Sequence, residues 1–389
     1  MDDPRLPSPP ALDLGNLLLL HALPNVGKRR LFELAQRAPF LLAEPVGKDF
    51  WLFVEKELHG AVPRAEQHAA AASAGKVLER LARDEFRLVH WFDDSYPPLL
   101  RQIYDPPLLL FCRGDAALLR GDCLAVVGAR NATDYGVTVA REFAARLAEA
   151  GLVVVSGMAK GIDSAAHLGA LKAGGKTLAV LGAGVDVIYP REAGFLYRRL
   201  CAEGCVASEF LPGVWPAPQN FPVRNRIISG LGWGTVIVEA TPRSGSLITA
   251  RLALEHNREL FAVPGPVHSP LSVGPNYLIK QGAKLVQLWQ DVAEELPAEV
   301  RARLRVQPEA VPAEPAVDGR FAAGAANEHL TNEEDVVYKC LFFDRKVHLD
   351  TLLGQTGLTM GRLGAVLLRL QFAGLAQELP GQYFLKNVR

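Results

Sequence analysis

Five short apolar runs, separated by segments of helical length, dominate residues 120–290. None of the runs alternates with polar residues, which is typical of strands that are buried on both faces of a sheet. Intervening segments such as Val137–Ala150 and Ala165–Ala173 are long enough for the crossover helices that connect parallel strands. The pattern therefore predicts a doubly wound, mostly parallel α/β sheet. The predicted strands contain Leu124–Val127, Leu152–Val155, Leu178–Leu181, Val236–Val238 and Leu260–Val263.

Small residues follow nearly every predicted strand, and ligands of such sheets bind beyond the carboxyl ends of the strands. Tight turns need glycine for steric reasons alone, so a single glycine-rich loop would carry little meaning. Several loops that combine hydroxyls or cations with backbone amides at helix starts indicate anion binding instead. The loops are Gly128–Arg130, Ser156–Gly161, Gly182–Gly184, Ser244–Ser246 with Thr249, and Pro264–Gly265.

The first of these loops lacks the dinucleotide fingerprint G-x-G-x-x-G. Arg130 stands where the second glycine would let a pyrophosphate approach, and Ser156 and Gly157 stand where an acid would bind the ribose. Both departures argue against NAD, so no cofactor is predicted. A guanidinium suits an external phosphate better, because its planar fork binds two oxygens.

A row of phosphate sites along a sheet edge fits the backbone of an extended single strand, because neighbouring strands lie about 4.8 Å apart. Asn220–Ile228 adds cations and an aromatic ring. Stacking a base on such a ring contributes about 1–3 kcal/mol, although Phe221 could equally be a core residue. Further cations that could line the crevice, or simply be solvated, are Lys176, Arg243 and Lys280.

The candidate acids and bases form no recognisable catalytic set. Asp163 and His167 are four residues apart and would share one helix face. The two residues could be a catalytic base and the partner that orients it. They could equally be an acid that caps the start of a helix and a histidine that packs in the core. No catalytic residue or metal site is predicted. One alternative stays open, a nucleotide-processing enzyme resembling a phosphoribohydrolase that uses Asp163, Glu209 or Glu239 in the same crevice.

Composition narrows the class of protein. Lys and Arg together number 42, as do Asp and Glu, so bulk charge does not hold this chain to nucleic acid or membrane. No apolar run approaches the ~18 residues of a membrane span, and the acidic start Met1–Pro4 is unlike a secretory signal. The five cysteines contain no CxxC pair, which predicts reduced thiols in a cytoplasmic protein.

Changes of pattern along the chain predict its domains. Prolines at 297, 308, 312 and 315 among alanines and charges indicate a linker over residues 297–327. Residues 1–110 are predicted to form an N-terminal helical domain, and residues 111–296 the sheet domain. Within the first domain, Leu23–Arg29 contains a glycine followed by two cations. This segment is either a phosphate site of the helix-hairpin-helix type or an ordinary packing turn.

Residues 328–389 have the order of a winged helix. Helices are predicted at 333–341, 349–356 and 360–373, followed by paired strands at 376–379 and 383–386. Arg362 and Arg369 lie on the third helix, whereas Glu378 and the weak net charge argue against DNA. Duplex DNA and a protein partner both stay open for this domain.

Together these motifs resemble the DNA-processing protein A family, also called Smf. The resemblance covers about residues 90–290 in the expected order. Its stretches are Tyr96–Leu100, Asp105–Pro107, Val126–Arg130, Ser156–Asp163 with Ala166 and His167, Val180–Gly184 with Tyr189 and Pro190, Ser208 and Glu209, Phe221–Ile228, Ser244–Ser246 with Thr249 and Ala250, Pro264 and Gly265, and Asn276–Ile279 with Gly282 and Ala283.

This resemblance implies an extended Rossmann-like domain, flanked by a small sterile-alpha-motif-like helical domain and a winged helix. It implies a non-catalytic, single-stranded-DNA-binding recombination mediator that protects incoming DNA and loads RecA recombinase in natural transformation. It also implies a homodimer through Tyr277–Val286.

The same resemblance implies that phosphate-binding roles fall on Arg130, Ser156, Gly157, Lys176, Arg224, Asn225, Arg226, Ser244 and Gly245. Ala129 stands where the family often has serine. With the loop residues above, the expected DNA-binding set is Gly128, Arg130, Ser156, Gly157, Lys160, Lys176, Gly182, Gly184, Phe221, Arg224, Asn225, Arg226, Ser244, Gly245, Ser246, Thr249 and Lys280.

Overall fold

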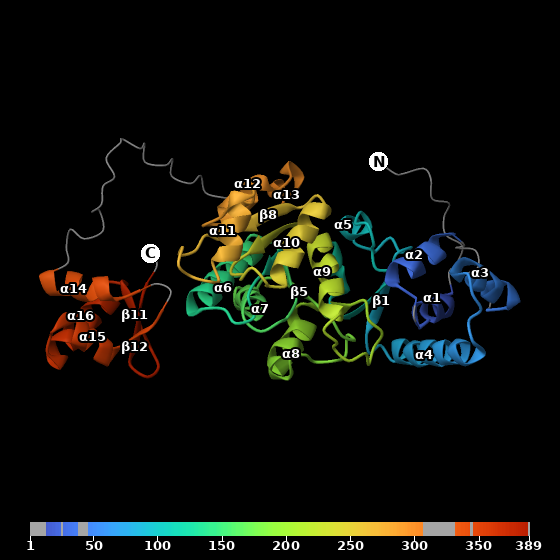
Figure 1. The fold of residues 1–389 in the computed structure, drawn as a ribbon, viewed down its shortest axis with the longest axis horizontal. Helices are drawn as coiled ribbons and strands as arrows, with labels where there is room; N and C mark the ends of the chain where they lie inside the picture. The colour runs from blue at the N-terminus through green and yellow to red at the C-terminus, as the bar shows by residue number, and fades with distance from the viewer. Residues whose placement is uncertain (1–12, 25, 38–45, 306–330, 343–344, 388–389) are drawn as a thin grey trace. The chain divides into compact units, whose positions relative to one another are not determined.

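The computed structural model describes residues 13–24, 26–37, 46–305, 331–342 and 345–387 (Figure 1). The chain forms two compact units, one of residues 1–131 and 140–307, the other of residues 132–139 and 308–389. Within the described residues, no helix combines the length and the apolar composition needed to cross a membrane.

The larger unit is built on a nine-stranded sheet in the order β1-β2-β6-β5-β4-β3-β7-β8-β9. Strands β3 to β9 pair in parallel, and β1 and β2 add an antiparallel edge. The mostly parallel α/β sheet is therefore confirmed. The strands are β1 (Arg87–His90), β2 (Leu109–Gly114), β3 (Cys123–Val127), β4 (Val153–Ser156), β5 (Thr177–Val180), β6 (Cys205–Ser208), β7 (Gly232–Ile237), β8 (Glu259–Ala262) and β9 (Lys284–Leu285).

Helices cover both faces of this sheet, as the unbroken apolar strands require. On β5, Leu178 and Val180 pack in the same cluster as Leu231, whereas Ala179 packs in the opposite cluster with Leu200. The helices that connect the parallel strands are α6 (Asp134–Glu149), α7 (Ile162–Lys172), α8 (Gly194–Glu203), α9 (Asn220–Leu231), α10 (Ser246–Glu255) and α11 (Val273–Lys280).

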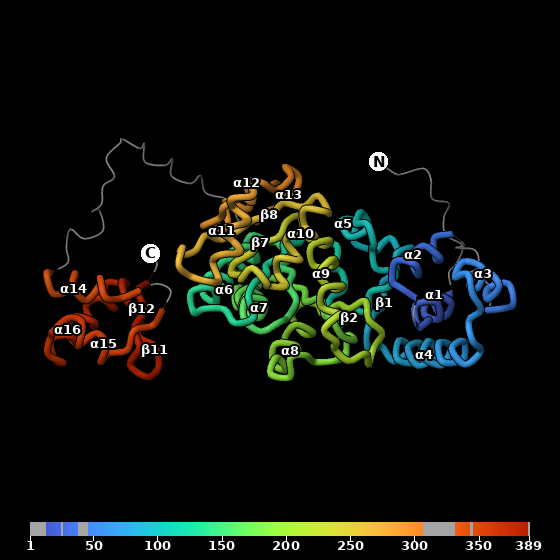
Figure 2. The backbone as a smooth tube through the Cα atoms, in the orientation of Figure 1, coloured from blue at the N-terminus to red at the C-terminus, as the bar shows by residue number. Residues whose placement is uncertain are grey.

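Among the described residues, four helices precede the sheet: α1 (Leu14–His21), α2 (Lys28–Arg37), α3 (Lys48–Leu58) and α4 (Arg64–Ala82). Figure 2 traces them as one group beside β1 and β2. Their apolar faces share one buried cluster with β2, including Leu17, Leu31, Val77 and Phe111.

The helical prediction for residues 1–110 is wrong from Arg87 onward. β1 and the start of β2 belong to the sheet, with only the short helix α5 (Pro98–Arg101) between them. Along β1, exposed Arg87 and buried Val89 follow the period of two that is typical of a half-buried strand.

The predicted linker also begins too early. After α12 (Trp289–Glu295), the chain forms α13 (Ala298–Ala302). Arg303 then pairs with Asp122 across 2.7 Å, and the amide of Arg305 donates to the carbonyl of Ala150. Residues 298–305 are therefore part of the larger unit, and the rest of the predicted linker lies outside the described residues.

The smaller unit has the predicted order of three helices and a strand pair. Its elements are α14 (Asn332–Cys340), β10 (Val347–His348), α15 (Leu349–Thr356), α16 (Met360–Phe372), β11 (Ala376–Leu379) and β12 (Tyr383–Lys386). The three strands are antiparallel in the order β10-β12-β11. A core of its own includes Val337, Leu352, Leu363 and Phe384.

Candidate nucleic-acid interface

A pocket opens where three parallel strands end. Arg130 follows β3, Lys160 follows β4, Gly182 follows β5, and Phe221 lies in the first turn of α9. The pocket is therefore at the carboxyl edge of the sheet, where parallel sheets bind ligands. Its complete lining is Arg130, Gly157, Ala159, Lys160, Leu181, Gly182, Ala183, Val187, Tyr189, Pro190 and Phe221.

Cations and aromatic rings give this pocket its chemistry. Arg130 and Lys160 are exposed, and none of the lining residues is acidic. The Arg130 guanidinium lies 5.2 Å from the ring centroid of Phe221, within cation–π range. The Phe221 and Tyr189 rings lie 5.6 Å apart, tilted by 38°. The arrangement suits a ligand that carries both a negative charge and a flat ring.

Two glycines make room for this arrangement. A Cβ atom on Gly182 would lie 2.9 Å from the Phe221 ring, and one on Gly157 would lie 2.6 Å from the Arg224 guanidinium. Both distances are shorter than real side chains allow. A side chain at either position would therefore displace the Phe221 ring or the Arg224 guanidinium from its place at the pocket.

The carboxylate of Asp163, at the start of α7, interacts with backbone amides that the sequence analysis predicted to bind phosphate. It accepts a hydrogen bond from the amide of Ala159 across 3.4 Å, and the amides of Gly128 and Gly157 also favour its charged form. Burial raises the pKa of Asp163, while these amides and Arg224 favour its charged form. At the ends of β3 and β4, the groups left available to an anion in the pocket are therefore the exposed Arg130 and Lys160 side chains.

Arg224, which is predicted to contact DNA, is buried. Its guanidinium donates to the carbonyl of Gly157 across 2.9 Å and also to the carbonyl of Val180. Burial lowers its pKa to about 10, and the nearby carboxylate of Asp163 opposes that shift. Arg224 therefore ties the ends of β4 and β5 together beneath the pocket.

With this geometry established, comparison with known proteins is informative. The family model described as DNA recombination-mediator protein A matches residues 87–297, and the model of the DprA winged helix domain matches residues 321–382. The chain belongs to the DNA recombination-mediator protein A family.

Individual relatives agree with this assignment. DNA processing protein DprA of Streptococcus pneumoniae is 48% identical over 203 residues, which are 52% of this chain and 72% of the relative. The protein of the same name from Bacillus subtilis is 45% identical, over 52% of this chain and 69% of the relative. The X-ray structure of the Streptococcus pneumoniae protein superposes with a TM-score of 0.65 at 36% identity, and covers 74% of this chain and 99% of that structure.

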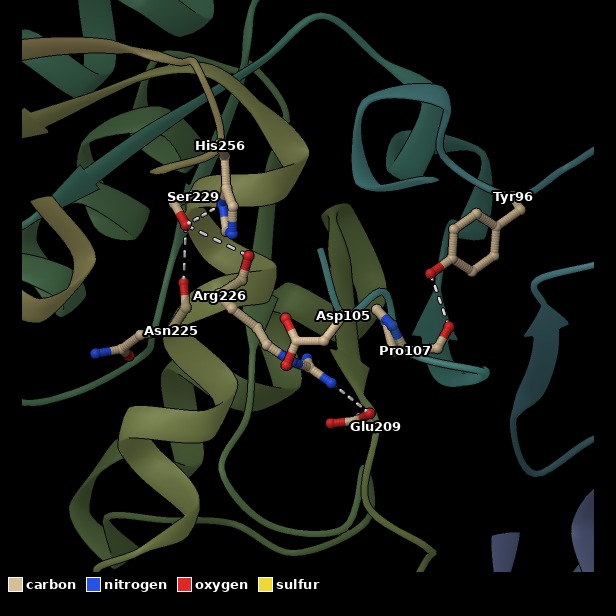
Figure 3. Close-up of polar contacts among 8 residues, drawn as sticks. All are labelled: Tyr96, Asp105, Pro107, Glu209, Asn225, Arg226, Ser229 and His256. Atoms are coloured by element: carbon tan, nitrogen blue, oxygen red, sulfur yellow. Dashed lines mark hydrogen bonds and ion pairs between the residues drawn. The ribbon is translucent and has the colours of Figure 1, made fainter. Parts of the chain in front are cut away.

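Arg226, the second arginine of the family motif in α9, is also buried. Its Nε lies 2.9 Å from Asp105, and its Nη2 lies 2.7 Å from Glu209 (Figure 3). Asp105 precedes β2 and Glu209 follows β6, so Arg226 joins α9 to two separate segments. These ion pairs give Arg226 a structural role, and its contact with DNA stays a prediction.

A second group of predicted residues lies where α10 begins. The Asn225 side-chain amide donates to the carbonyl of Gly245 across 3.3 Å and links this loop to α9. Gly245 is exposed and Ser244 is half-buried, whereas Ser246 and Thr249 are buried. Ser244 Oγ accepts from the amide of Thr241. The loop thus presents Gly245 and part of Ser244 to solvent.

Four other residues predicted to contact DNA do not line the pocket. The Ser156 hydroxyl is buried and donates to the carbonyl of Val126. Gly184 is buried beside the carbonyl of Leu211. Lys176 precedes β5 and donates to the carbonyl of Glu203, so it lies at the amino edge, opposite the pocket. Lys280 is exposed at the end of α11, away from the residues that line the pocket.

The turn before α2 is a packing turn, so the phosphate-site alternative is not favoured. Lys28 Nζ lies 3.0 Å from His21 Nε2, and burial lowers the pKa of Lys28. The Arg29 guanidinium stacks 3.6 Å from the ring centroid of Tyr104. Both cations are therefore engaged within the larger unit; Asn25 lies outside the described residues.

His167 is a packing residue, as the simpler interpretation of the sequence had it. Its Nδ1 lies 2.6 Å from Thr177 Oγ1, and that hydroxyl donates its hydrogen to the carbonyl of Val154. Nδ1 must therefore carry the proton. Burial lowers the pKa of His167 to about 3. Among the described residues, no cluster of His, Cys, Asp and Glu is suited to a metal ion.

Acid should destabilise the larger unit through His167. The folded pKa of about 3 lies below the ordinary value of 6.5, so between these values the unfolded chain takes up a proton that the folded chain does not. Stability falls as pH drops through this window, by up to about 1.4 kcal/mol per pH unit. In urea unfolding between pH 7 and pH 4, the free energy of unfolding should fall less steeply with acid in His167→Gln than in the control His268→Gln, whose histidine is exposed. Equal slopes would contradict the assignment.

Proposed function

We propose that this recombination mediator holds the sugar-phosphate backbone of single-stranded DNA along the carboxyl edge of its sheet. The observation that carries the proposal is the acid-free pocket, which is lined by Arg130, Lys160 and the rings of Phe221 and Tyr189. Cations beside aromatic rings are the usual means of binding an unpaired strand without sequence preference. The exposed backbone of Gly245 offers a further contact on the other side of β3.

The proposal includes the partners that family membership suggests. We propose that the protein acts in the cytoplasm, delivers the bound strand to RecA recombinase during natural transformation, and works as a homodimer. Four large apolar side chains that are exposed within residues 273–288 support a dimer surface, because exposed apolar patches mark sites of protein interaction. These side chains are Val273, Tyr277, Leu285 and Leu288.

We further propose that the protein has no catalytic step. Asp163 is buried and accepts a hydrogen bond from the amide of Ala159, and Glu209 is paired with Arg226. Neither carboxylate lines the pocket. A nucleotide-processing enzyme would need one of them, or Glu239, beside the substrate. Incubation with nucleoside monophosphates should therefore release no free base, and base release that is lost in Glu239→Gln would establish the enzyme instead.

The winged helix offers little to duplex DNA on its third helix. The face of α16 opposite the core consists of Gly361, Ala365, Leu368 and Phe372, and Phe372 is 83% exposed. The two arginines of α16 lie 3.3 Å and 3.6 Å from carboxylates of α14. We therefore assign DNA binding to the sheet unit.

Binding to matched single-stranded and duplex oligonucleotides over a salt series tests the proposal. We expect sub-micromolar affinity for the single strand and at least tenfold weaker binding to duplex. Each neutralised phosphate should contribute about −0.7 to the slope of log K against log salt. Fluorescence anisotropy gives both quantities. Equal affinity for the two forms, or a slope near zero, would contradict a backbone-binding site.

A further inference from the structure

Trp215 is the one tryptophan that the larger unit leaves largely in solvent. Its side chain is 70% exposed, whereas Trp51, Trp91, Trp233 and Trp289 are buried or half-buried. Exposing so large an apolar ring forfeits the favourable transfer from water that its burial would give. Packing within the unit therefore does not explain its position.

The backbone places Trp215 beside the pocket. Its segment follows β6, which lies parallel to β5, so it is at the same carboxyl edge. The amide of Gly184 donates to the carbonyl of Val214 across 2.8 Å. Gly184 is two residues from Gly182, which lines the pocket. Trp215 thus lies one strand along from the pocket, and neighbouring strands are about 4.8 Å apart.

Hydrogen bonds also anchor the two residues before Trp215. Asp186 accepts a hydrogen bond from the amide of Gly213 across 2.7 Å, and its other oxygen lies 2.8 Å from Arg80 of α4. The ion pair with Arg80 offsets the negative charge of Asp186, which would otherwise repel a phosphate. A fixed backbone presents the ring with little loss of conformational entropy on binding.

We infer that Trp215 stacks on a base of the bound single strand and extends the site from the Phe221 pocket toward β6. The inference rests on the proposed function, because it needs the polynucleotide to run along this edge. Stacking on an aromatic face tolerates any base, so Trp215 adds affinity and length to the site without sequence preference. A ligand confined to the Phe221 pocket would not reach it.

Three variants of the full chain test the inference, with oligothymidylate as the probe. Trp215→Ala should bind a long oligonucleotide roughly tenfold more weakly at an unchanged salt slope, since no phosphate contact is lost. Trp215→Phe should keep affinity within about twofold but lose most of the DNA-induced quenching of tryptophan fluorescence. Phe372→Ala, an exposed aromatic of the other unit, is the matched control and should behave as wild type.

Ligand length gives a readout that a merely structural role would not move. Binding of a trinucleotide should be the same in Trp215→Ala and wild type, because the short ligand is held at the pocket alone. If Trp215→Ala binds the long oligonucleotide normally while charge reversal at Arg130 and Lys160 prevents binding, the inference fails and the proposed function stands. If wild-type protein does not bind single-stranded DNA, both fail.

Discussion

Replacing Arg130 and Lys160 together by glutamate is expected to weaken single-stranded DNA binding at least a hundredfold. Both side chains are exposed and both line the pocket. Their reversal would turn the two cations of the pocket into carboxylates that repel the phosphates. Two lost phosphate contacts should also reduce the slope of log K against log salt by about 1.4. Anisotropy titrations at several salt concentrations measure both effects.

Lys176→Glu is the matched control for this double variant. Lys176 is equally exposed, but it precedes β5 and lies at the opposite edge of the sheet. We expect a change of less than about threefold, since interactions beyond the Debye length of about 8 Å are largely screened at physiological salt. Severe loss in Lys176→Glu with normal binding in the double variant would move the site to the amino edge and refute the assignment.

Five strands of the sheet were predictable because they are buried apolar runs, whereas β6 is also buried but was not among the predicted strands. The apolar runs at 124–127, 152–155, 178–181, 236–238 and 260–263 fall on β3, β4, β5, β7 and β8 within a few residues. The edge strands gave no such signal. β1 is four residues long and half-buried, and β9 is two residues long, so neither can form an uninterrupted apolar run.

The sequence also shows whether a residue precedes or follows its strand, and this order predicts the edge of the sheet at which Lys176 lies. Residues that follow a parallel strand reach the carboxyl edge, whereas residues that precede it reach the amino edge. Lys176 directly precedes the Leu178 run. Arg130 and Lys160 follow their strands, and the structure brings both into the pocket.

Burial of the motif arginines could not be predicted from their spacing. Two arginines two residues apart, such as Arg224 and Arg226, are typical of a phosphate site, yet both are buried. Their partners are a carbonyl of β5 and the carboxylates of Asp105 and Glu209, which are distant in sequence. Only the assembled fold shows that these charges are already compensated.

Arg226→Met is expected to lower the free energy of unfolding of the larger unit by about 3–5 kcal/mol, because it leaves Glu209 charged and buried without its partner. Glu209 is 1% exposed and lies 2.7 Å from the guanidinium. Methionine keeps much of the volume of the side chain, so the loss reports the charge and not a cavity. Urea unfolding followed by intrinsic fluorescence measures the change.

The double variant Arg226→Met with Glu209→Leu separates this role from DNA binding. Replacing both members of a buried ion pair by apolar residues is often neutral or stabilising, so most of the lost stability should return. The double variant should then bind single-stranded DNA nearly as tightly as wild type, since neither side chain lines the pocket. Stable folding in Arg226→Met together with a large loss of DNA affinity would show instead that Arg226 contacts the strand, as its place in the family motif first suggested.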